Sequence, residues 1–201
     1  VLSISGNTVL CIGSAVSQTV SGASTYTWNT GSNSSVVSLN PSSNTTYTVS
    51  GTNGSTGCSN SAFLSISVAP LPIINVNSGN ICAGQVFTLV PSGASTYSYS
   101  SGSNTVSPLT NSSYFVSGTS SLGCVSSGSA ISNVIVNPAP IIVLNSGGIC
   151  AGGSFTITPG GASTYTFLNG SSIVSPASNT SYSVIGTSVL GCVSNTPGVS
   201  N

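Results

Sequence analysis

Cysteine and tyrosine are the only side chains in this sequence with an ionisable group, because Lys, Arg, Asp, Glu and His are all absent. General acid–base catalysis near neutral pH relies mainly on those missing types. The Ser and Thr hydroxyls therefore have no side-chain base to activate them as nucleophiles. The composition excludes hydrolytic triads, and we expect no catalytic residue and no enzymatic activity.

The missing charges also remove most binding chemistry. An average domain of 201 residues would carry roughly 50 charged side chains, and this chain has none. Nucleic-acid phosphates are held chiefly by Lys and Arg, and hard cations by carboxylates. We therefore expect no nucleic-acid partner, no metal site and no cofactor. Formal neutrality removes the repulsion that keeps proteins apart, so association with copies of itself is the expected behaviour.

The segment Gly-Ala-Ser-Thr-Tyr occurs three times, at 22–26, 93–97 and 161–165. Such self-similarity is the signature of a tandem array. The junctions, at 69–72 and 137–140, contain alternating prolines, which suit short semi-rigid linkers. The predicted domains are residues 1–69, 70–138 and 139–201, the last with an incomplete closing strand. We refer to these segments as repeats 1, 2 and 3.

Each repeat alternates apolar and polar residues with period 2 between Gly, Asn, Ser and Pro, and none has a helical stripe. This pattern predicts an all-β fold of three tandem small antiparallel Ig-like β-sandwich domains, with about one disulfide each. Six strands are expected per repeat. In repeat 2 they are 73–77, 86–91, 95–100, 104–107, 113–118 and 130–136.

The six Cys are expected to form structural disulfides, since no C-x-x-C spacing suggests zinc. Disulfides imply an oxidising compartment, so the chain is expected to be extracellular or at a cell surface. In a simple up-and-down succession of strands, the first and last connections of a repeat lie at the same end. Pairing within each repeat is therefore predicted, although bonds between repeats or chains stay open. The predicted pairs are Cys11–Cys58, Cys82–Cys124 and Cys150–Cys192.

Aromatic residues alternate on the strand that ends each repeated segment. Tyr26 and Trp28 project to the same side, as do Tyr97 and Tyr99. Aromatics on the third strand of a sandwich usually fill the core, and that is the prediction here. An exposed platform for stacking on sugars is the alternative. A core role is also predicted for Tyr47, Tyr114 and Tyr182.

Repeats 1 and 2 finish with the apolar–polar strands 62–68 and 130–136, whereas repeat 3 stops partway through the equivalent strand. An open sheet edge is a template for strand addition from another chain. One hypothesis is that the first residues of a neighbouring copy dock at this end and extend a head-to-tail filament. No transmembrane segment is expected in the chain. The alternative is that the natural chain continues past 201. The candidate contact residues are Val1, Leu2, Ile4 and Val199.

The pattern N-x-[ST] marks candidate acceptors for N-linked glycans. Three of them occupy the same place in the three repeats, and attached glycans would hydrate a surface without charge. The candidate sites are Asn33, Asn44, Asn53, Asn111, Asn169 and Asn179.

The order C-x-G, Gly-Ala-Ser-Thr-Tyr-x-aromatic, Asn-x-x-Tyr-x-Val-x-Gly-Thr, Gly-Cys and Pro-x-Pro resembles the tandem Ig-like or PKD-like repeats of secreted surface proteins of Bacteroidota. The resemblance covers the whole chain. It implies cell-surface export and β-sandwich modules with roles in adhesion, gliding or matrix fibres. Those relatives commonly carry Trp where this chain has Trp28, Tyr99 and Phe167, and they contain some Asp and Lys.

The leading functional expectation is a structural subunit of an extracellular fibre, whose partners are copies of itself and covalently attached glycans. A stalk segment of a large adhesin, with its carbohydrate- or ligand-binding tip elsewhere, is the main alternative. An ice or glycan binder is a third, but no regular exposed T-x-T face runs through all three repeats.

Overall fold

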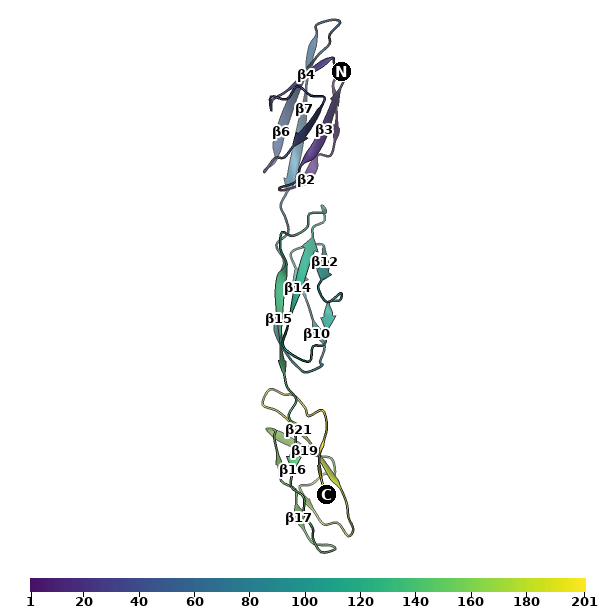
Figure 1. The fold of residues 1–201 in the computed structure, drawn as a ribbon, viewed down its shortest axis with the longest axis vertical. Helices are drawn as coiled ribbons and strands as arrows, with labels where there is room; N and C mark the ends of the chain where they lie inside the picture. The colour runs from purple at the N-terminus through teal and green to yellow at the C-terminus, as the bar shows by residue number, and fades with distance from the viewer. The chain divides into compact units, whose positions relative to one another are not determined.

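The computed structural model describes residues 1–201 and consists of β-strands joined by turns (Figure 1). The all-β prediction is confirmed. The structure holds no helix with the length and apolar character of a membrane crossing. The strands are β1 (Ser3–Gly6), β2 (Val9–Cys11), β3 (Val16–Ser21), β4 (Thr25–Trp28), β5 (Val36–Leu39), β6 (Thr45–Thr52), β7 (Ser59–Ala69), β8 (Asn75–Val76), β9 (Gly79–Cys82), β10 (Phe87–Thr88), β11 (Pro91–Ser92), β12 (Thr96–Tyr99), β13 (Thr105–Val106), β14 (Ser112–Thr119), β15 (Ala130–Asn137), β16 (Val143–Leu144), β17 (Phe155–Thr156), β18 (Pro159–Gly160), β19 (Thr164–Phe167), β20 (Ile173–Val174), β21 (Tyr182–Thr187) and β22 (Gly198–Ser200).

Backbone contacts divide the chain into two compact units. Unit 1 comprises Val1–Asn75, Pro91–Tyr99 and Val116–Ala130, and unit 2 comprises Val76–Val90, Ser100–Phe115 and Ile131–Asn201. The division therefore passes through repeat 2. The domain boundaries near 70 and 139 stay a prediction from the sequence.

Repeat 1, within unit 1, is a sandwich of two sheets. Three strands pair in the order β1-β3-β5 and four in the order β2-β7-β6-β4, an arrangement of the immunoglobulin type. Both sheets contribute to one core, because alternate side chains of each strand point inward. The buried residues of this core are Leu10, Val20, Trp28, Val37, Leu39, Val49, Leu64 and Ile66.

The parallel pairing of β2 and β7 determines where the first cysteine lies. Val9 is in register with Ser67 and Cys11 with Ala69. Cys11 therefore lies beside the last residue of β7, where the chain leaves repeat 1. The remaining pairings of this repeat are antiparallel, including the long hairpin of β6 and β7.

Repeat 2 contains strands at the six predicted places and two more, β9 and the two-residue β11. β8, β10, β12, β13, β14 and β15 each fall within or next to a predicted range. The sequence did not predict β9, which pairs parallel to β15 and puts Cys82 in register with Asn137. This pairing repeats that of β2 with β7 in repeat 1.

Repeat 3 has the same framework with a much shorter closing strand. β19 pairs with β21, which pairs with β22, and all of these pairings are antiparallel. β22 has 3 residues, whereas β7 has 11 and β15 has 8. The segment around Gly147, equivalent to β2 and β9, therefore has no complete strand partner. Its remaining backbone link is the Gly147 N–H, which donates to the Asn201 carbonyl at 3.3 Å.

Candidate functional site

The disulfides do not follow the predicted pairing. The structure joins Cys11 to Cys124 and Cys82 to Cys192, with the Cα atoms 5.5 Å apart in each pair. Cys58 and Cys150 are free and exposed. The predicted pairs Cys11–Cys58, Cys82–Cys124 and Cys150–Cys192 are therefore wrong. Each bond instead runs from the first cysteine of one repeat to the last cysteine of the next.

The physical reason lies in the parallel strand. Cys58 immediately precedes β7, whereas Cys11 is in register with the last residue of β7. A strand rises about 3.3 Å per residue, so the 11 residues of β7 separate these two cysteines by on the order of 30 Å. A disulfide requires Cα atoms closer than about 7 Å. Cys11 and Cys58 are therefore too far apart to form a disulfide, and the parallel pairing of β9 with β15 separates Cys82 from Cys124 in the same way.

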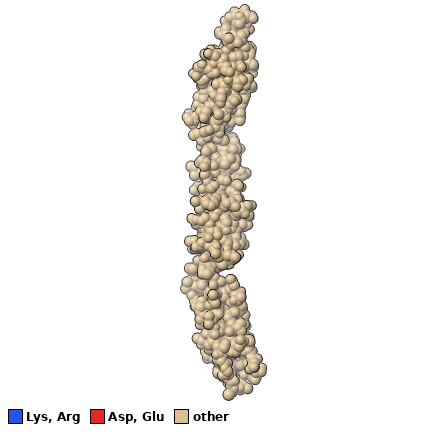
Figure 2. Space-filling model, in the orientation of Figure 1, with Lys and Arg blue, Asp and Glu red and all other residues tan.

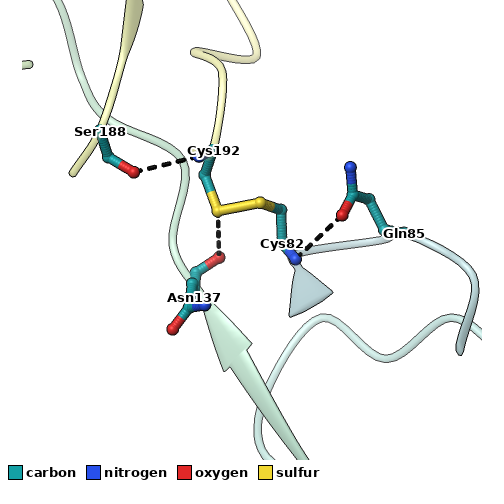
Figure 3. Close-up of a disulfide and its surroundings, with 5 residues drawn as sticks. All are labelled: Cys82, Gln85, Asn137, Ser188 and Cys192. Carbon is teal, nitrogen blue, oxygen red and sulfur yellow. Dashed lines mark hydrogen bonds between the residues drawn. A yellow bond between two sulfur atoms is a disulfide. The ribbon is translucent and has the colours of Figure 1, made fainter. Parts of the chain in front are cut away.

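Figure 3 shows the bond between Cys82 and Cys192 beside the end of β15. The Cys192 N–H donates to Ser188 Oγ at 3.1 Å, and the Cys82 N–H donates to Gln85 Oε1 at 3.2 Å. Cys192 Sγ lies 3.8 Å from the Asn137 carbonyl oxygen; this is a packing contact, since a disulfide sulfur carries no proton. Both flanking backbones are thus anchored by neutral hydrogen bonds.

The repeated Gly-Ala-Ser-Thr-Tyr segment forms a local clasp. In each copy the tyrosine hydroxyl accepts from the alanine N–H at 2.9–3.2 Å and donates to the alanine carbonyl at 2.8–2.9 Å. The leading glycine has a φ near +100°, and a Cβ on Gly22 would lie 2.2 Å from the Val1 carbonyl oxygen. The motif is therefore explained by structure. The tyrosines that form the clasp are Tyr26, Tyr97 and Tyr165.

The aromatic side chain at the position of Trp28 is most deeply buried in repeat 1. Trp28 is 1% exposed, and its indole N–H donates to the Ser34 carbonyl at 3.1 Å. Tyr26 and Tyr47 pack against the same core, which confirms the core prediction for these residues and removes Trp28 from any sugar platform. The residues at the position of Trp28 in the other repeats, Tyr99 and Phe167, are half-buried. Tyr114 and Tyr182, at the position of Tyr47, are half-buried as well.

Repeat 3 carries an open groove of about 570 Å³ where the closing strand is short. One wall is the backbone of 147–149 and the other is the loop 176–181, with Asn201 at the end. In repeats 1 and 2 the ends of β7 and β15 pair with the equivalent segments. The groove therefore lies at the place that the end of the closing strand occupies in repeats 1 and 2. We call it the repeat 3 groove.

The asparagine at the edge of this groove has structural counterparts. Asn44 Oδ1 accepts the Val68 N–H at 2.7 Å, and Asn111 Oδ1 accepts the Val136 N–H at 2.7 Å. Asn179 lines the repeat 3 groove at the same place in the repeat. Strand closure thus explains why this asparagine recurs. All six candidate glycan acceptors are exposed, and their modification stays a prediction.

Of the four candidate subunit-contact residues, two pack within repeat 1 and two lie on the surface. Ile4 in β1 is in register with Val20, and Leu2 packs against the core. Val1 is fully exposed, and Val199 is half exposed in β22. Strand addition by the first residues of another copy would therefore require β1 to leave β3.

The surface has no Lys, Arg, Asp, Glu or His side chain to offer a partner. Figure 2 shows a face with neither blue nor red atoms, as the sequence requires. Recognition by this chain must therefore use backbone groups, hydroxyls, amides, apolar contacts or thiols.

Neither protein-family models nor curated protein sequences match the chain. Solved structures with similarity to it include the three N-terminal domains of the bacteriophage RB49 highly immunogenic outer capsid protein, at 12% identity and a TM-score of 0.45, covering 100% of this chain and 97% of that one. The I-band fragment I67–I69 of titin matches at 10% identity and a TM-score of 0.40, covering 98% and 95%. A structure described as concerning host cell surface retention of a 1.5-MDa bacterial ice-binding adhesin matches at 14% identity and a TM-score of 0.34, covering 99% and 96%.

Proposed function

We propose that the chain is a structural subunit of an extracellular fibre in which copies associate head to tail. The observation that carries this proposal is the direction of the disulfides, each of which runs from one repeat to the following one. Such bonds link each repeat covalently to the repeat that follows it in the sequence. The activity of the protein is then mechanical continuity.

An extracellular location suits this chemistry. Disulfides persist in oxidising compartments and are rare in the cytosol. A neutral surface with large exposed side chains such as Phe63, Ile73 and Leu109 also favours association over dispersal. Both features support a subunit that resides in an assembly.

Strand addition is the proposed non-covalent contact between copies. The repeat 3 groove is lined by residues 147–149 and has Asn179 at its edge. An extended segment of a neighbouring copy would supply the N–H groups that Val68 and Val136 supply in repeats 1 and 2. The partner is a second copy of the chain.

The stalk of a large adhesin is a second candidate, because bonds between successive repeats of one chain require no second molecule. Negative-stain electron microscopy of the purified chain separates the two. Regular filaments are expected for a fibre subunit. Isolated particles at every concentration tested would contradict the fibre and favour the stalk.

Glycans on exposed asparagines belong to the same proposal, since they would hydrate a surface without charge. Asn44 and Asn111 use Oδ1 for strand closure, which leaves Nδ2 as the atom that would carry the sugar. Peptide mass spectrometry of native material is expected to show added hexose masses. Unmodified peptides at all six candidate sites would remove glycans from the proposal.

A further inference from the structure

We propose that Cys150 of one copy forms a disulfide with Cys58 of the next, so that the fibre is covalent along its length. This inference rests on the head-to-tail association proposed above. It names the residues that join the copies, and the bond is equivalent to the two already present within each chain.

The first argument is the rule that the observed bonds obey. The cysteine that ends the short parallel strand of one repeat pairs with the cysteine after the β14 or β21 strand of the following repeat. This happens twice, with the same Cα separation of 5.5 Å. Applied to the two free cysteines, the rule requires a following repeat for Cys150 and a preceding repeat for Cys58. A second copy placed head to tail supplies both.

The second argument is that Cys150 already has the backbone of a paired cysteine. Its carbonyl accepts the Gly153 N–H at 2.8 Å, as the carbonyl of Cys82 accepts the Gln85 N–H at 3.0 Å. The next turn is also shared, because Gly152 donates to the Pro176 carbonyl and Gly84 to the Pro108 carbonyl, both at 3.0 Å. The turn that presents Cys82 is therefore reproduced at Cys150.

The same holds for Cys58. The Asn53 N–H donates to the Cys58 carbonyl at 2.9 Å, and the equivalent bonds close the turns at Cys124 and Cys192 at 2.8 and 2.9 Å. A glycine with positive φ precedes each of these cysteines, with φ of 69° at Gly57 and 81° at Gly123. The turn in repeat 1 has one more residue, but the cysteine leaves it with the same backbone anchor.

Exposure distinguishes the free cysteines from their bonded counterparts. Once paired, Cys124 and Cys192 are 1% and 0% exposed and Cys11 and Cys82 are half-buried, whereas Cys58 and Cys150 are exposed. The free thiols are therefore accessible to another molecule. A fibre bond would cover them as the internal bonds cover their equivalents.

The reaction requires an oxidant, which we assign to a low-molecular-weight disulfide such as oxidised glutathione. The thiolate of one cysteine attacks the small disulfide, forms a mixed disulfide and releases one small thiol. The thiolate of the second cysteine then displaces the other small thiol and completes the bond. Two S–H bonds and one S–S bond are replaced by one protein S–S bond and two small thiols, so protons and electrons balance.

The test uses two single variants of the full chain, Cys58→Ser and Cys150→Ser. Each keeps both internal disulfides and one free thiol. After incubation in a glutathione redox buffer, non-reducing electrophoresis is expected to show a covalent dimer in the mixture of the two variants and none in either alone. Peptide mapping of the dimer is expected to find Cys150 linked to Cys58. The Cys58→Ser, Cys150→Ser double variant is the matched control and should stay monomeric.

Three outcomes would overturn the inference: equal dimer yields in the separate variants, a mixture with no dimer, or thiols capped only by glutathione. Peptide mapping of each variant checks that the native internal bonds Cys11–Cys124 and Cys82–Cys192 have formed. Microscopy of the double variant tests the fibre in the absence of the proposed bond. Wild-type filaments that contain no Cys150–Cys58 bond would overturn the covalent bond while supporting the fibre. A specific Cys150–Cys58 dimer without filaments would support the bond and contradict the fibre.

Discussion

Repeat 1 and repeat 3 share a framework but differ in how it is closed. Both have the tyrosine clasp and the turn after the first cysteine, with nearly the same hydrogen-bond lengths. Repeat 1 adds an 11-residue closing strand and the buried Trp28, whereas repeat 3 has the 3-residue β22 and a half-buried Phe167. The local motif thus forms in both repeats despite their different cores, and we expect the stability of each repeat to depend on its closing strand and disulfide.

The largest effect is expected from the disulfide of the weaker repeat. The Cys82→Ser, Cys192→Ser double variant removes a link between residues 110 apart, which should lower the free energy of unfolding by about 4 to 5 kcal/mol by the chain-entropy model. Hydrogen exchange of β21 should then become much faster than that of β6. Equal protection of the two strands would contradict the view that repeat 3 depends on its disulfide.

The next largest loss of stability is expected from replacing the aromatic residue of the core. Trp28→Ala empties a fully buried site and should cost about 3 to 5 kcal/mol. Phe167→Ala, at a half-buried site, should cost about half as much. Calorimetric unfolding of the two variants measures the difference. If Phe167→Ala proved the more damaging, the ranking of the two cores would be reversed.

Completing the short strand should strengthen repeat 3. Appending Val-Ile-Val-Asn after Asn201, copied from Val134–Asn137, should fill the repeat 3 groove and stabilise the fold by about 2 to 3 kcal/mol through apolar burial. A Ser-Ser-Ser-Asn extension is the matched control and should have little effect. Thermal unfolding monitored by circular dichroism compares the two, and identical midpoints would show that the groove does not accept a strand.

The smallest expected change in the free energy of unfolding distinguishes Asn44 from Asn179, which occupy equivalent positions in repeats 1 and 3. Asn44→Ala removes the acceptor of the Val68 N–H and should cost about 1 kcal/mol. Asn179→Ala should cost almost nothing in the 201-residue chain but about 1 kcal/mol in the Val-Ile-Val-Asn extension. Denaturant titrations of the three variants and of their two parent chains provide the comparison. A full cost for Asn179→Ala without the extension would mean that Asn179 has another partner.

Period-2 patterns were enough to predict the fold class and six strands of repeat 2. The alternation in β5 shows why, since Val37 and Leu39 are buried while Val36 and Ser38 are exposed. The strand β9 could not be predicted in this way, because Gly79-Asn-Ile-Cys82 has one large aliphatic residue and no alternation. Parallel pairing with β15, a tertiary contact, makes it a strand.

The error in the cysteine pairs followed from that omission. Without β9 and its counterpart β2, the sequence suggested a plain succession of antiparallel strands with both cysteines at one end. The parallel strand carries Cys11 to the exit of its repeat instead. Four of the six cysteines predicted to form disulfides are bonded in the structure, and their partners depend on a strand direction that spacing alone does not reveal.

The two disulfides also interlock along the sequence. The loop closed by Cys11 and Cys124 overlaps the loop closed by Cys82 and Cys192. The shortest covalent path between the termini follows residues 1–11, crosses to 124, returns to 82, crosses to 192 and ends at 201. A molecule stretched from its ends therefore keeps residues 12–81 and 125–191 free of tension until a sulfur–sulfur bond breaks. Single-molecule force spectroscopy should find a short contour length that increases abruptly when reductant is added.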